Sequence, residues 1–392
     1  MNTSFAGQRR SVRSVAAGLG LAAGLAVSAC GVSGAASDAS GTATSGVAKA
    51  AKAHLEKLSQ PVSGAPDLGD PVDTSKVAGK TVFYVPIALK AGHFPFVQKN
   101  LQEALAKVGA DLHTCDGQGN PSGFGACLDQ AVQQRPAAVI TDYIPYELAS
   151  TAFEKLRSAG VPVFIAGAKQ PQGVATSKAF AFGDPENYGF NAVEGEADAV
   201  IADSDGKAHV LFLQLNASTA IEAQGQHTID YFKRACPHCV LTVKGVNLGI
   251  MSNIPSLVSS ALVRDPGIGY VVPQTDTYLA AAVSGVQAAG KTRSIKISSS
   301  GDVLASVQQV KSNPQLLAMA GTNPPYLAWT MADSVFRMVA GQAPPETYPV
   351  LNRVFTKQNV NSLDLTTAAE AGGQWFGSTG YKQAFANLWS AK

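Results

Sequence analysis

The sequence predicts an α/β protein with two doubly wound parallel-sheet lobes joined by a hinge. Apolar strands alternate with amphipathic helices from about residue 80, and the same alternation starts again after residue 179. Such alternation is typical of parallel sheets that helices cover on both faces. The chain has 392 residues, of which 46% are hydrophobic and 15% are charged. It is therefore longer than one domain of about 150 residues, and its composition excludes a disordered chain.

The first 29 residues have the composition of a bacterial export signal. Three arginines precede an apolar run at 15–27, which is shorter than the roughly 20 residues of a membrane span. The run ends in Val27-Ser28-Ala29-Cys30, which resembles the lipobox of bacterial lipoproteins. The resemblance implies cleavage before Cys30, a lipid on Cys30, and anchoring to the extracytoplasmic face of the cell membrane. An ordinary cleavage site is the alternative, and general and twin-arginine export both remain open.

The charge balance excludes a strongly basic nucleic-acid binder. Lys and Arg number 30 and Asp and Glu number 28, for a formal net charge of +2. Removal of 1–29, with its three arginines, leaves 27 basic and 28 acidic residues. A nearly neutral chain offers no charged surface that would attract a polyanion.

The elements of the first half follow from their periodicity and their Gly and Pro boundaries. Residues 30–79 should form a polar tether and a helix at 47–60, followed by an extended arm. The next elements are predicted strands at 81–88, 110–115, 137–141 and 161–165, and predicted helices at 95–109, 123–134 and 146–160.

The second half repeats this pattern. Its apolar runs are again short enough for buried parallel strands, and its helices again end at Gly, Pro or polar turns. Strands are predicted at 179–182, 209–214, 240–246, 270–273, 294–298, 317–320 and 349–355, and helices at 187–203, 219–234, 254–264, 277–289, 303–312, 325–339 and 380–388.

These elements divide the chain into two expected lobes. Lobe 1 comprises 80–184 plus about 302–320, and lobe 2 comprises 185–301 plus about 321–355. Residues 356–392 are then a C-terminal extension.

Polar residues follow many of the predicted strands. Ligands of doubly wound sheets bind beyond the carboxyl ends of the strands, so these positions are site candidates. They lie at 88–96, 142–143, 167–169, 216, 275–276, 299–302 and 322–323.

Four segments, in order along the chain, carry a family resemblance. They read FPFVQKNLQEALAKVGADLHTCDGQGNP, AVITDYIPYELASTAFEKLRSAGVPVFIAG, FGDPENYGFNAVEGEADAVI and VVPQTDTYLAAAVSGVQAAGK. They are similar to segments of ribose-type periplasmic binding proteins over about residues 80–341. The resemblance implies a type I solute-binding protein, the capture subunit that passes a small solute to the permease of an ABC importer.

The resemblance also implies which residues contact the solute. The family stacks a sugar ring on aromatic residues that correspond to Phe94 and Phe96. Its Gln-Asn-Asp run corresponds to a segment in which Thr275 replaces the Asn and Asp276 is kept. A late Gln of the family corresponds to Thr322.

Several charged clamps of the family are absent. Its fourth strand ends in Asp-Arg, but residues 166–169 read Ala-Gly-Ala-Lys here. A later Arg corresponds to Gln226, and the Asn after the third strand corresponds to Asp142. The Asp of its Phe-Asp-Gly run corresponds to Ser300, unless a shift of one residue makes Asp302 the equivalent.

These departures bear on the solute. A buried sugar hydroxyl without a partner costs roughly 1–3 kcal/mol, so a ribose-like pyranose should bind poorly unless other polar groups replace the clamps. We expect a solute that is sugar-like or less hydroxylated. The candidate ligand-binding residues are His93, Phe94, Phe96, Asp142, Tyr143, Asn216, Gln226, Thr275, Asp276, Ser300 and Thr322.

Each candidate also has a structural interpretation. Phe94 and Phe96 are alternatively core residues at the start of a helix. Asp142 and Asp276 are each placed to cap the helix that follows. Trp329 and its apolar helix are expected in the core.

The five cysteines are accounted for by one lipid and two disulfides. Cys236 and Cys239 form a C-x-x-C motif that resembles that of thioredoxin-fold thiol oxidants, but here the motif follows a predicted helix and precedes a strand, which is the reverse order. A structural disulfide is the better interpretation. Cys115 and Cys127 should form a second disulfide, because export favours oxidation, and Cys30 then remains for the lipid.

The sequence favours a binding protein over an enzyme. It contains no G-x-S-x-G, H-E-x-x-H or P-loop motif, and we expect no cofactor and no metal. A sensory lipoprotein that presents its solute to a receptor is one alternative, and a thiol–disulfide oxidoreductase that uses Cys236 and Cys239 is another. Nothing in the chain requires an oligomer, so a monomer is expected.

Overall fold

The computed structural model describes residues 36–90, 92–183, 185–217 and 219–390. Cys30 and the export signal lie outside the described residues. The chain divides into two compact units, Met1–Ser40 and Gly41–Lys392. The first unit contributes to the described structure only the start of helix α1 (Ala36–Leu58), and the following paragraphs describe the second unit.

The first sheet has five parallel strands in the order β2-β1-β3-β4-β5. Side chains alternate between its faces: Val82 and Tyr84 of β1 point into one core, and Phe83 and Val85 point into another. Burial on both faces explains why the strands are continuous apolar runs. The strands are β1 (Thr81–Pro86), β2 (Asp111–Thr114), β3 (Ala138–Asp142), β4 (Val163–Ala166) and β5 (Phe180–Phe182).

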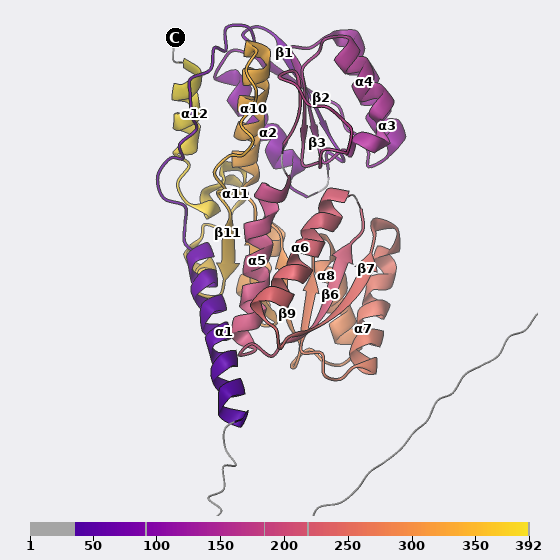
Figure 1. Cartoon of the computed structure of the whole chain (residues 1–392), viewed down its shortest axis with the longest axis vertical. Helices are drawn as coiled ribbons and strands as arrows, with labels where there is room; N and C mark the ends of the chain where they lie inside the picture. The colour runs from indigo at the N-terminus through magenta and orange to yellow at the C-terminus, as the bar shows by residue number, and fades with distance from the viewer. Residues whose placement is uncertain (1–35, 91, 184, 218, 391–392) are drawn as a thin grey trace, which may run out of the picture. The chain divides into compact units, whose positions relative to one another are not determined.

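Helices cover both faces of this sheet. α3 (Pro121–Gln134) and α4 (Ser150–Ser158) lie side by side on one face (Figure 1). α2 (Phe94–Ala106) and α10 (Pro324–Ala340) pack together on the other face. The sheet is therefore shielded from water except at its edges and at the ends of its strands.

The second sheet has six strands in the order β11-β10-β9-β8-β6-β7. All neighbours are parallel except β10 and β11. The predicted α/β fold with two parallel-sheet lobes is thus confirmed. The elements are β6 (His209–Leu215), β7 (Val240–Val246), β8 (Tyr270–Pro273), β9 (Lys296–Ser300), β10 (Leu316–Gly321), β11 (Arg353–Thr356), α5 (Pro185–Asp203), α6 (Thr219–Ala235), α7 (Ile254–Arg264), α8 (Leu279–Ala288) and α9 (Leu304–Ser312).

Short helices complete the structure. Two of them split helices that were predicted as continuous, because η1 precedes α4 and η3 precedes α8. The remaining elements are η1 (Tyr146–Leu148), η2 (Leu248–Asn253), η3 (Asp276–Tyr278), η4 (Val360–Ser362), η5 (Gln374–Phe376), α11 (Thr367–Gly372) and α12 (Tyr381–Ser390).

The late segments join different lobes from those predicted. α9 and β10, which were assigned to lobe 1 with residues 302–320, pack through Val307 and Met319 in the core of the second sheet. α10, which was assigned to lobe 2 with residues 321–355, packs through Trp329 and Phe336 in the core of the first sheet. The prediction failed here because periodicity identifies an element but not the sheet that it joins.

The C-terminal residues are built into both lobes rather than forming a separate extension. Phe376 packs in the core of the second lobe. α12 packs on α10, where Trp389 stacks on Trp329 with ring centroids 5.3 Å apart. Trp389 Nε1 also donates to Asp333 Oδ1 at 2.8 Å. The predicted core position of Trp329 is confirmed, because its side chain is fully buried.

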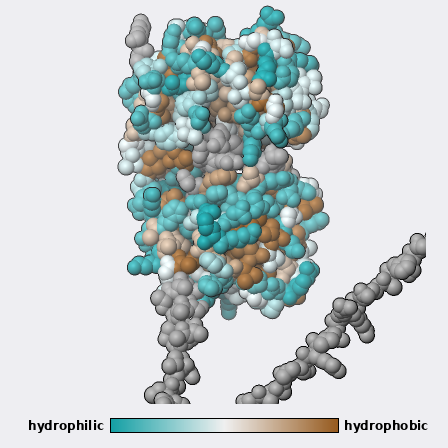
Figure 2. Space-filling view, viewed as in Figure 1, coloured by the Kyte–Doolittle hydropathy of each residue, from teal (hydrophilic) through white to brown (hydrophobic). Residues whose placement is uncertain are grey.

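The outer surface is mixed in polarity. Figure 2 shows a face on which hydrophilic residues are interspersed with small hydrophobic patches. Of the helices in the described part of the chain, none has the length and apolarity that a membrane crossing requires.

We predict that Trp389→Ala destabilises the first lobe strongly. The substitution removes a buried aromatic side chain and leaves Asp333 Oδ1 without its indole donor, so unfolding should require about 3–5 kcal/mol less free energy. Urea denaturation measures this change. Asn387→Ala, on the exposed face of the same helix, is the control and should change stability by no more than about 0.5 kcal/mol; similar values for the two variants would contradict the prediction.

Candidate functional site

Three rings lie together at the carboxyl end of the first sheet. His93 immediately precedes α2, and its ring centroid lies 4.8 Å from that of Phe94 and 5.8 Å from that of Tyr143. The Phe94 and Tyr143 rings meet edge to face at 5.9 Å. Phe94 is buried, and His93 and Tyr143 are partly exposed, so two of these rings reach the surface.

The backbone after β3 and β4 positions the Tyr143 ring. Tyr143 has a left-handed conformation with φ of 59°, which is uncommon for a residue with a side chain. Gly167, just after β4, would place a Cβ atom 2.6 Å from Tyr143 Cδ2 if it were substituted. Glycine at 167 is therefore required for the ring to lie over the end of β4.

Asp142, the last residue of β3, is a fully buried carboxylate. Its Oδ2 accepts a hydrogen bond from the Tyr84 hydroxyl at 2.8 Å. Its Oδ1 is buried and has no hydrogen-bond partner among the described residues. Burial raises the pKa of Asp142, while the nearby His93 and the Tyr84 hydrogen bond lower it.

Two further carboxylates come from the second sheet. Asp276 follows β8, and Asp302 follows β9. Asp302 Oδ2 accepts a hydrogen bond from Thr322 Oγ1 at 2.6 Å and lies 3.7 Å from His93 Nδ1. Burial raises the pKa of each carboxyl to about 6, and the neighbouring Asp302 adds to the rise for Asp276.

Asp276 does not cap the following helix, which corrects one of its two predicted roles. The cap is Thr275, whose Oγ1 accepts from the Thr277 backbone N–H at 3.5 Å and donates to Asp276 Oδ1 at 3.4 Å. Asp276 instead lies against Gly301, where a Cβ atom would approach Asp276 Oδ2 to 2.3 Å. The glycine after β9 therefore leaves room for this carboxylate.

His93 connects the groups from the two sheets. Burial lowers its pKa, and the opposing effects of Asp142 and Asp276 are smaller. Its imidazole is therefore neutral at pH 7. We call His93, Phe94, Tyr143, Asp142, Asp276 and Asp302 the strand-end cluster. No three His, Cys, Asp or Glu side chains in the described ranges are grouped so that they could hold a metal ion.

Five other predicted residues are distributed unevenly around this cluster. Thr275 and Thr322 contact its carboxylates, and the Ser300 hydroxyl donates to the carbonyl of Gln274 beside them. Asn216 is exposed at the end of β6, and Phe96 is half-buried in the first turn of α2. The Phe96 backbone N–H donates to the His93 carbonyl at 2.9 Å, whereas no interaction found among the described residues joins Asn216 to His93.

Gln226 points away from the cluster. It is exposed on α6, and its Nε2 donates to Asp230 Oδ1 at 2.9 Å. Gln226 precedes the buried Phe232 by six positions, which corresponds to about 600° of helical rotation and turns Gln226 toward solvent. The structure therefore does not bring Gln226 to the position that the resemblance implied.

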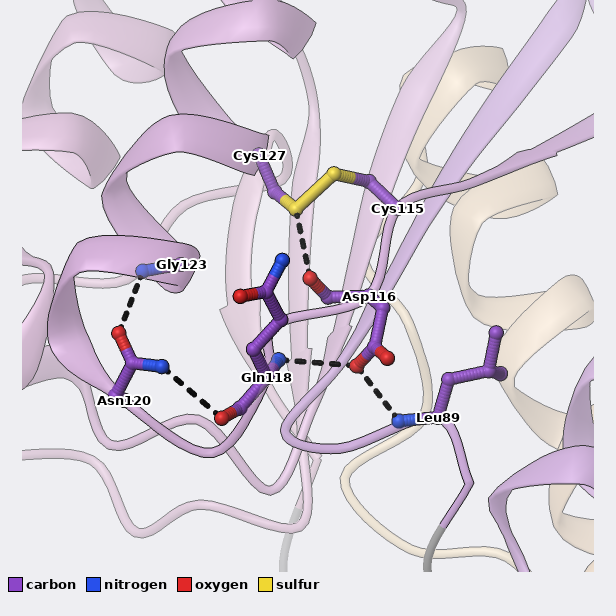
Figure 3. The surroundings of a disulfide bond; sticks show 7 residues. All are labelled: Leu89, Cys115, Asp116, Gln118, Asn120, Gly123 and Cys127. Carbon is purple, nitrogen blue, oxygen red and sulfur yellow. Dashed lines mark hydrogen bonds between the residues drawn. A yellow bond between two sulfur atoms is a disulfide. The ribbon is translucent and has the colours of Figure 1, made fainter.

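Two acidic residues were missing from the predicted set. Asp302 stands in a predicted strand-end segment, but the alignment with the family favoured Ser300. Asp116 follows β2, and its Oδ1 accepts from the backbone N–H groups of Leu89 and Gln118, both at 2.9 Å (Figure 3). Asp116 thereby ties the loop that leads to His93 to the loop that precedes α3. The run of polar residues that follows the second strand was the feature of the sequence that could have identified Asp116.

A disulfide closes the loop that precedes α3. Cys115, after β2, is bonded to Cys127 of α3, with Cα atoms 5.7 Å apart (Figure 3). Asn120 caps α3 within the loop that the disulfide closes, because its Oδ1 accepts from the Gly123 backbone N–H at 3.0 Å. The predicted pairing is confirmed, as is the Cys236–Cys239 disulfide.

Comparison with known proteins identifies a matching family. Residues 82–343 match the family model described as a periplasmic binding protein domain. The structure is similar to that of a 5-methylthioribose transporter solute-binding protein from Thermotoga lettingae in complex with 5-methylthioribose, at 15% identity and a TM-score of 0.65 over 83% of this chain and 99% of that chain. No curated protein matches the chain.

Two further solved structures are similar. One is an ABC transporter periplasmic solute-binding protein from Actinobacillus succinogenes with bound D-allose, at 16% identity and a TM-score of 0.63 over 72% of this chain and 99% of that chain. The other is a sugar ABC transporter protein from Yersinia enterocolitica, at 14% identity and a TM-score of 0.63 over 84% of this chain and 99% of that chain. At such identities the likeness shows the fold alone.

We predict that Asp276→Asn stabilises the protein at pH 7.5 but not at pH 4. The folded pKa of about 6 exceeds the ordinary value of 3.8, so the folded state loses stability as the pH rises from about 4 to about 6. Asparagine removes this penalty, which is at most about 3 kcal/mol for a shift of two units. Thermal melting across this pH range measures the effect. The exposed Asp230→Asn is the control. A loss of stability in Asp276→Asn at pH 7.5 would contradict the predicted gain.

We also predict that the two disulfides contribute unequally to stability. Replacing Cys115 and Cys127 with serine opens a loop with a sequence separation of 12, and replacing Cys236 and Cys239 opens one with a separation of 3. Loop-closure entropy gives losses of about 3 and about 1.6 kcal/mol respectively. Urea denaturation of the two double variants compares them. An equal or larger loss for the Cys236 and Cys239 pair would rule out this account.

Proposed function

Because the chain belongs to the family of periplasmic binding protein domains, we propose that it is a lipid-anchored extracytoplasmic protein that captures a small, sugar-like solute and delivers it to an ABC permease. The family is solute-binding and not catalytic. The proposed anchor is a lipid on Cys30, and its support is the lipobox-like Val27-Ser28-Ala29-Cys30 that ends the apolar run.

The observation that carries the proposal is the strand-end cluster itself. His93, Phe94, Tyr143 and Asp142 come from the first lobe, and Asp276 and Asp302 come from the second lobe. A solute that contacts both groups would be bound by two lobes at once. Groups at the carboxyl ends of strands in both sheets are where ligands of doubly wound folds bind.

The chemistry of the cluster suits a hydroxylated ring. Tyr143, packed on the buried Phe94, offers apolar ring surface, and the three carboxylates accept hydrogen bonds from hydroxyl groups. Two of the similar structures contain bound 5-methylthioribose and bound D-allose, respectively. Binding would shift the population toward a closed arrangement of the lobes, because the solute interacts with both lobes only in that arrangement.

We predict that a screen of the full chain, purified in mild detergent, identifies a stabilising solute. The panel contains sugars, polyols, nucleosides, aromatic acids and amino acids. A ligand at 100 times its dissociation constant stabilises the folded state by about 2.7 kcal/mol, which thermal melting detects. Phe94→Ala and Asp142→Asn should each abolish the shift.

Gln226→Ala is the matched control for this screen, because Gln226 is exposed and hydrogen-bonded away from the cluster. It should keep the full shift. If Gln226→Ala lost the thermal shift while Phe94→Ala kept it, the binding site would lie at α6 instead of at the strand-end cluster. The absence of any shift across the panel would count against solute capture.

A further inference from the structure

Within the described ranges, the carboxylates of the strand-end cluster have no lysine or arginine partner. Among the basic side chains in the described part of the chain, only His93 lies close enough to affect the pKa of Asp142 or Asp276. The same ring lies 3.7 Å from Asp302 Oδ2. No lysine or arginine of the described ranges forms an ion pair with these three residues. Negative charge is therefore concentrated where the solute is proposed to bind.

Asp142 presents a hydrogen-bond acceptor that nothing in the described structure satisfies. The side chain is fully buried, Tyr84 holds Oδ2, and Oδ1 has no partner among the described residues. Asp333 shows how the same chain satisfies another buried carboxylate: it accepts from Arg337 Nε at 2.7 Å, from the Tyr348 hydroxyl at 2.8 Å and from Trp389 Nε1 at 2.8 Å. An unpaired buried oxygen is costly, and a donor from the solute would remove this cost.

The hydroxyl groups around the carboxylates already donate to protein acceptors. Thr322 Oγ1 donates to Asp302, and Thr275 Oγ1 donates to Asp276. Ser300 Oγ donates to the Gln274 carbonyl. A neutral hydroxyl of a solute both donates and accepts, so at this site its lone pairs find few donors.

A protonated amine matches these conditions better than a hydroxyl does. An ammonium group has three donors, no acceptor and a positive charge. The Phe94 and Tyr143 rings lie beside His93, whose Nδ1 is 3.7 Å from Asp302 Oδ2, and aromatic faces attract organic cations. The described residues are not grouped to coordinate a metal ion, which favours an organic cation over a metal.

Building on the proposed function, we propose that the captured solute is an amine-bearing polyol, such as an amino sugar or an imino sugar. Its ammonium group contacts Asp142 and at least one of Asp276 and Asp302, and its hydroxylated ring lies against Tyr143, which packs on Phe94. The class of solute is thus distinguished from neutral sugars by charge rather than by ring shape.

The test compares matched pairs of probes that differ in the amine. The pairs are D-glucosamine with D-glucose, D-galactosamine with D-galactose, and 1-deoxynojirimycin with 1,5-anhydro-D-glucitol. N-Acetyl-D-glucosamine is the uncharged control, and putrescine is an amine without a hydroxylated ring. Isothermal titration calorimetry on the full chain in detergent, at pH 7 and low salt, measures each affinity.

At least one amine should bind 10-fold or more tightly than its neutral partner and more tightly than putrescine. Asp142→Asn should reduce that amine's affinity roughly 10- to 100-fold, because it removes a charge-assisted hydrogen bond. If Asp142→Asn fails to fold, Asp276→Asn, for which we predict increased stability, provides the same comparison. Gln226→Ala should retain the preference for the amine.

The outcomes separate this inference from the function on which it rests. If neutral sugars bind as tightly as the amines, or if Asp142→Asn and Asp276→Asn both keep the preference, the inference fails and solute capture stands. If none of the amines binds while a neutral solute of the wider panel does, the inference also fails and the proposed function stands. Silence of every probe in both panels contradicts the inference and the proposed function together.

Discussion

A parallel sheet that is covered by helices on both faces can present polar side chains only at its edges and where its strands end. Both lobes of this protein obey that constraint, since the side chains of β1 in the first sheet and of β6 in the second each alternate between two apolar cores. Asp142, Asp276 and Asp302 stand where β3, β8 and β9 end. The strand-end cluster therefore follows from the architecture, and its chemistry depends on a small number of residues that loops bring to those ends.

Glycines, a hydrogen-bonded carboxylate and a disulfide determine the shape of those loops. Glycines at 167 and 301 leave room for the Tyr143 ring and the Asp276 carboxylate, which a Cβ atom would displace. Asp116 holds the loop before His93 against the loop before α3, and the Cys115–Cys127 disulfide closes the loop before α3. Rigidity near the cluster is thus local, and it needs no contact with the opposite lobe.

The sequence predicted those features that depend on short-range patterns. The alternation of strands and helices, both disulfides and the strand-end positions of Asp142 and Asp276 all follow from local spacing. The assignment of α9, β10 and α10 to lobes did not, because a helical or apolar run carries no information about which sheet it will cover. Gln226 was placed by counting residues from a family motif, and the rotation of α6 turned it to solvent. Asp302 was left out of the predicted set because the alignment with the family favoured Ser300. A shift of one residue in that alignment would have selected Asp302 instead.

The first lobe draws its core from distant parts of the chain. Leu68 and Val72 lie in the arm before β1, Trp329 and Phe336 lie in α10, and Trp389 lies in α12, yet all of them share one apolar cluster. A ribosome produces these segments hundreds of residues apart, so this core cannot close while the chain is still being made. Contacts of such long sequence separation form slowly. The first lobe therefore keeps an incomplete core until α12 has been synthesised.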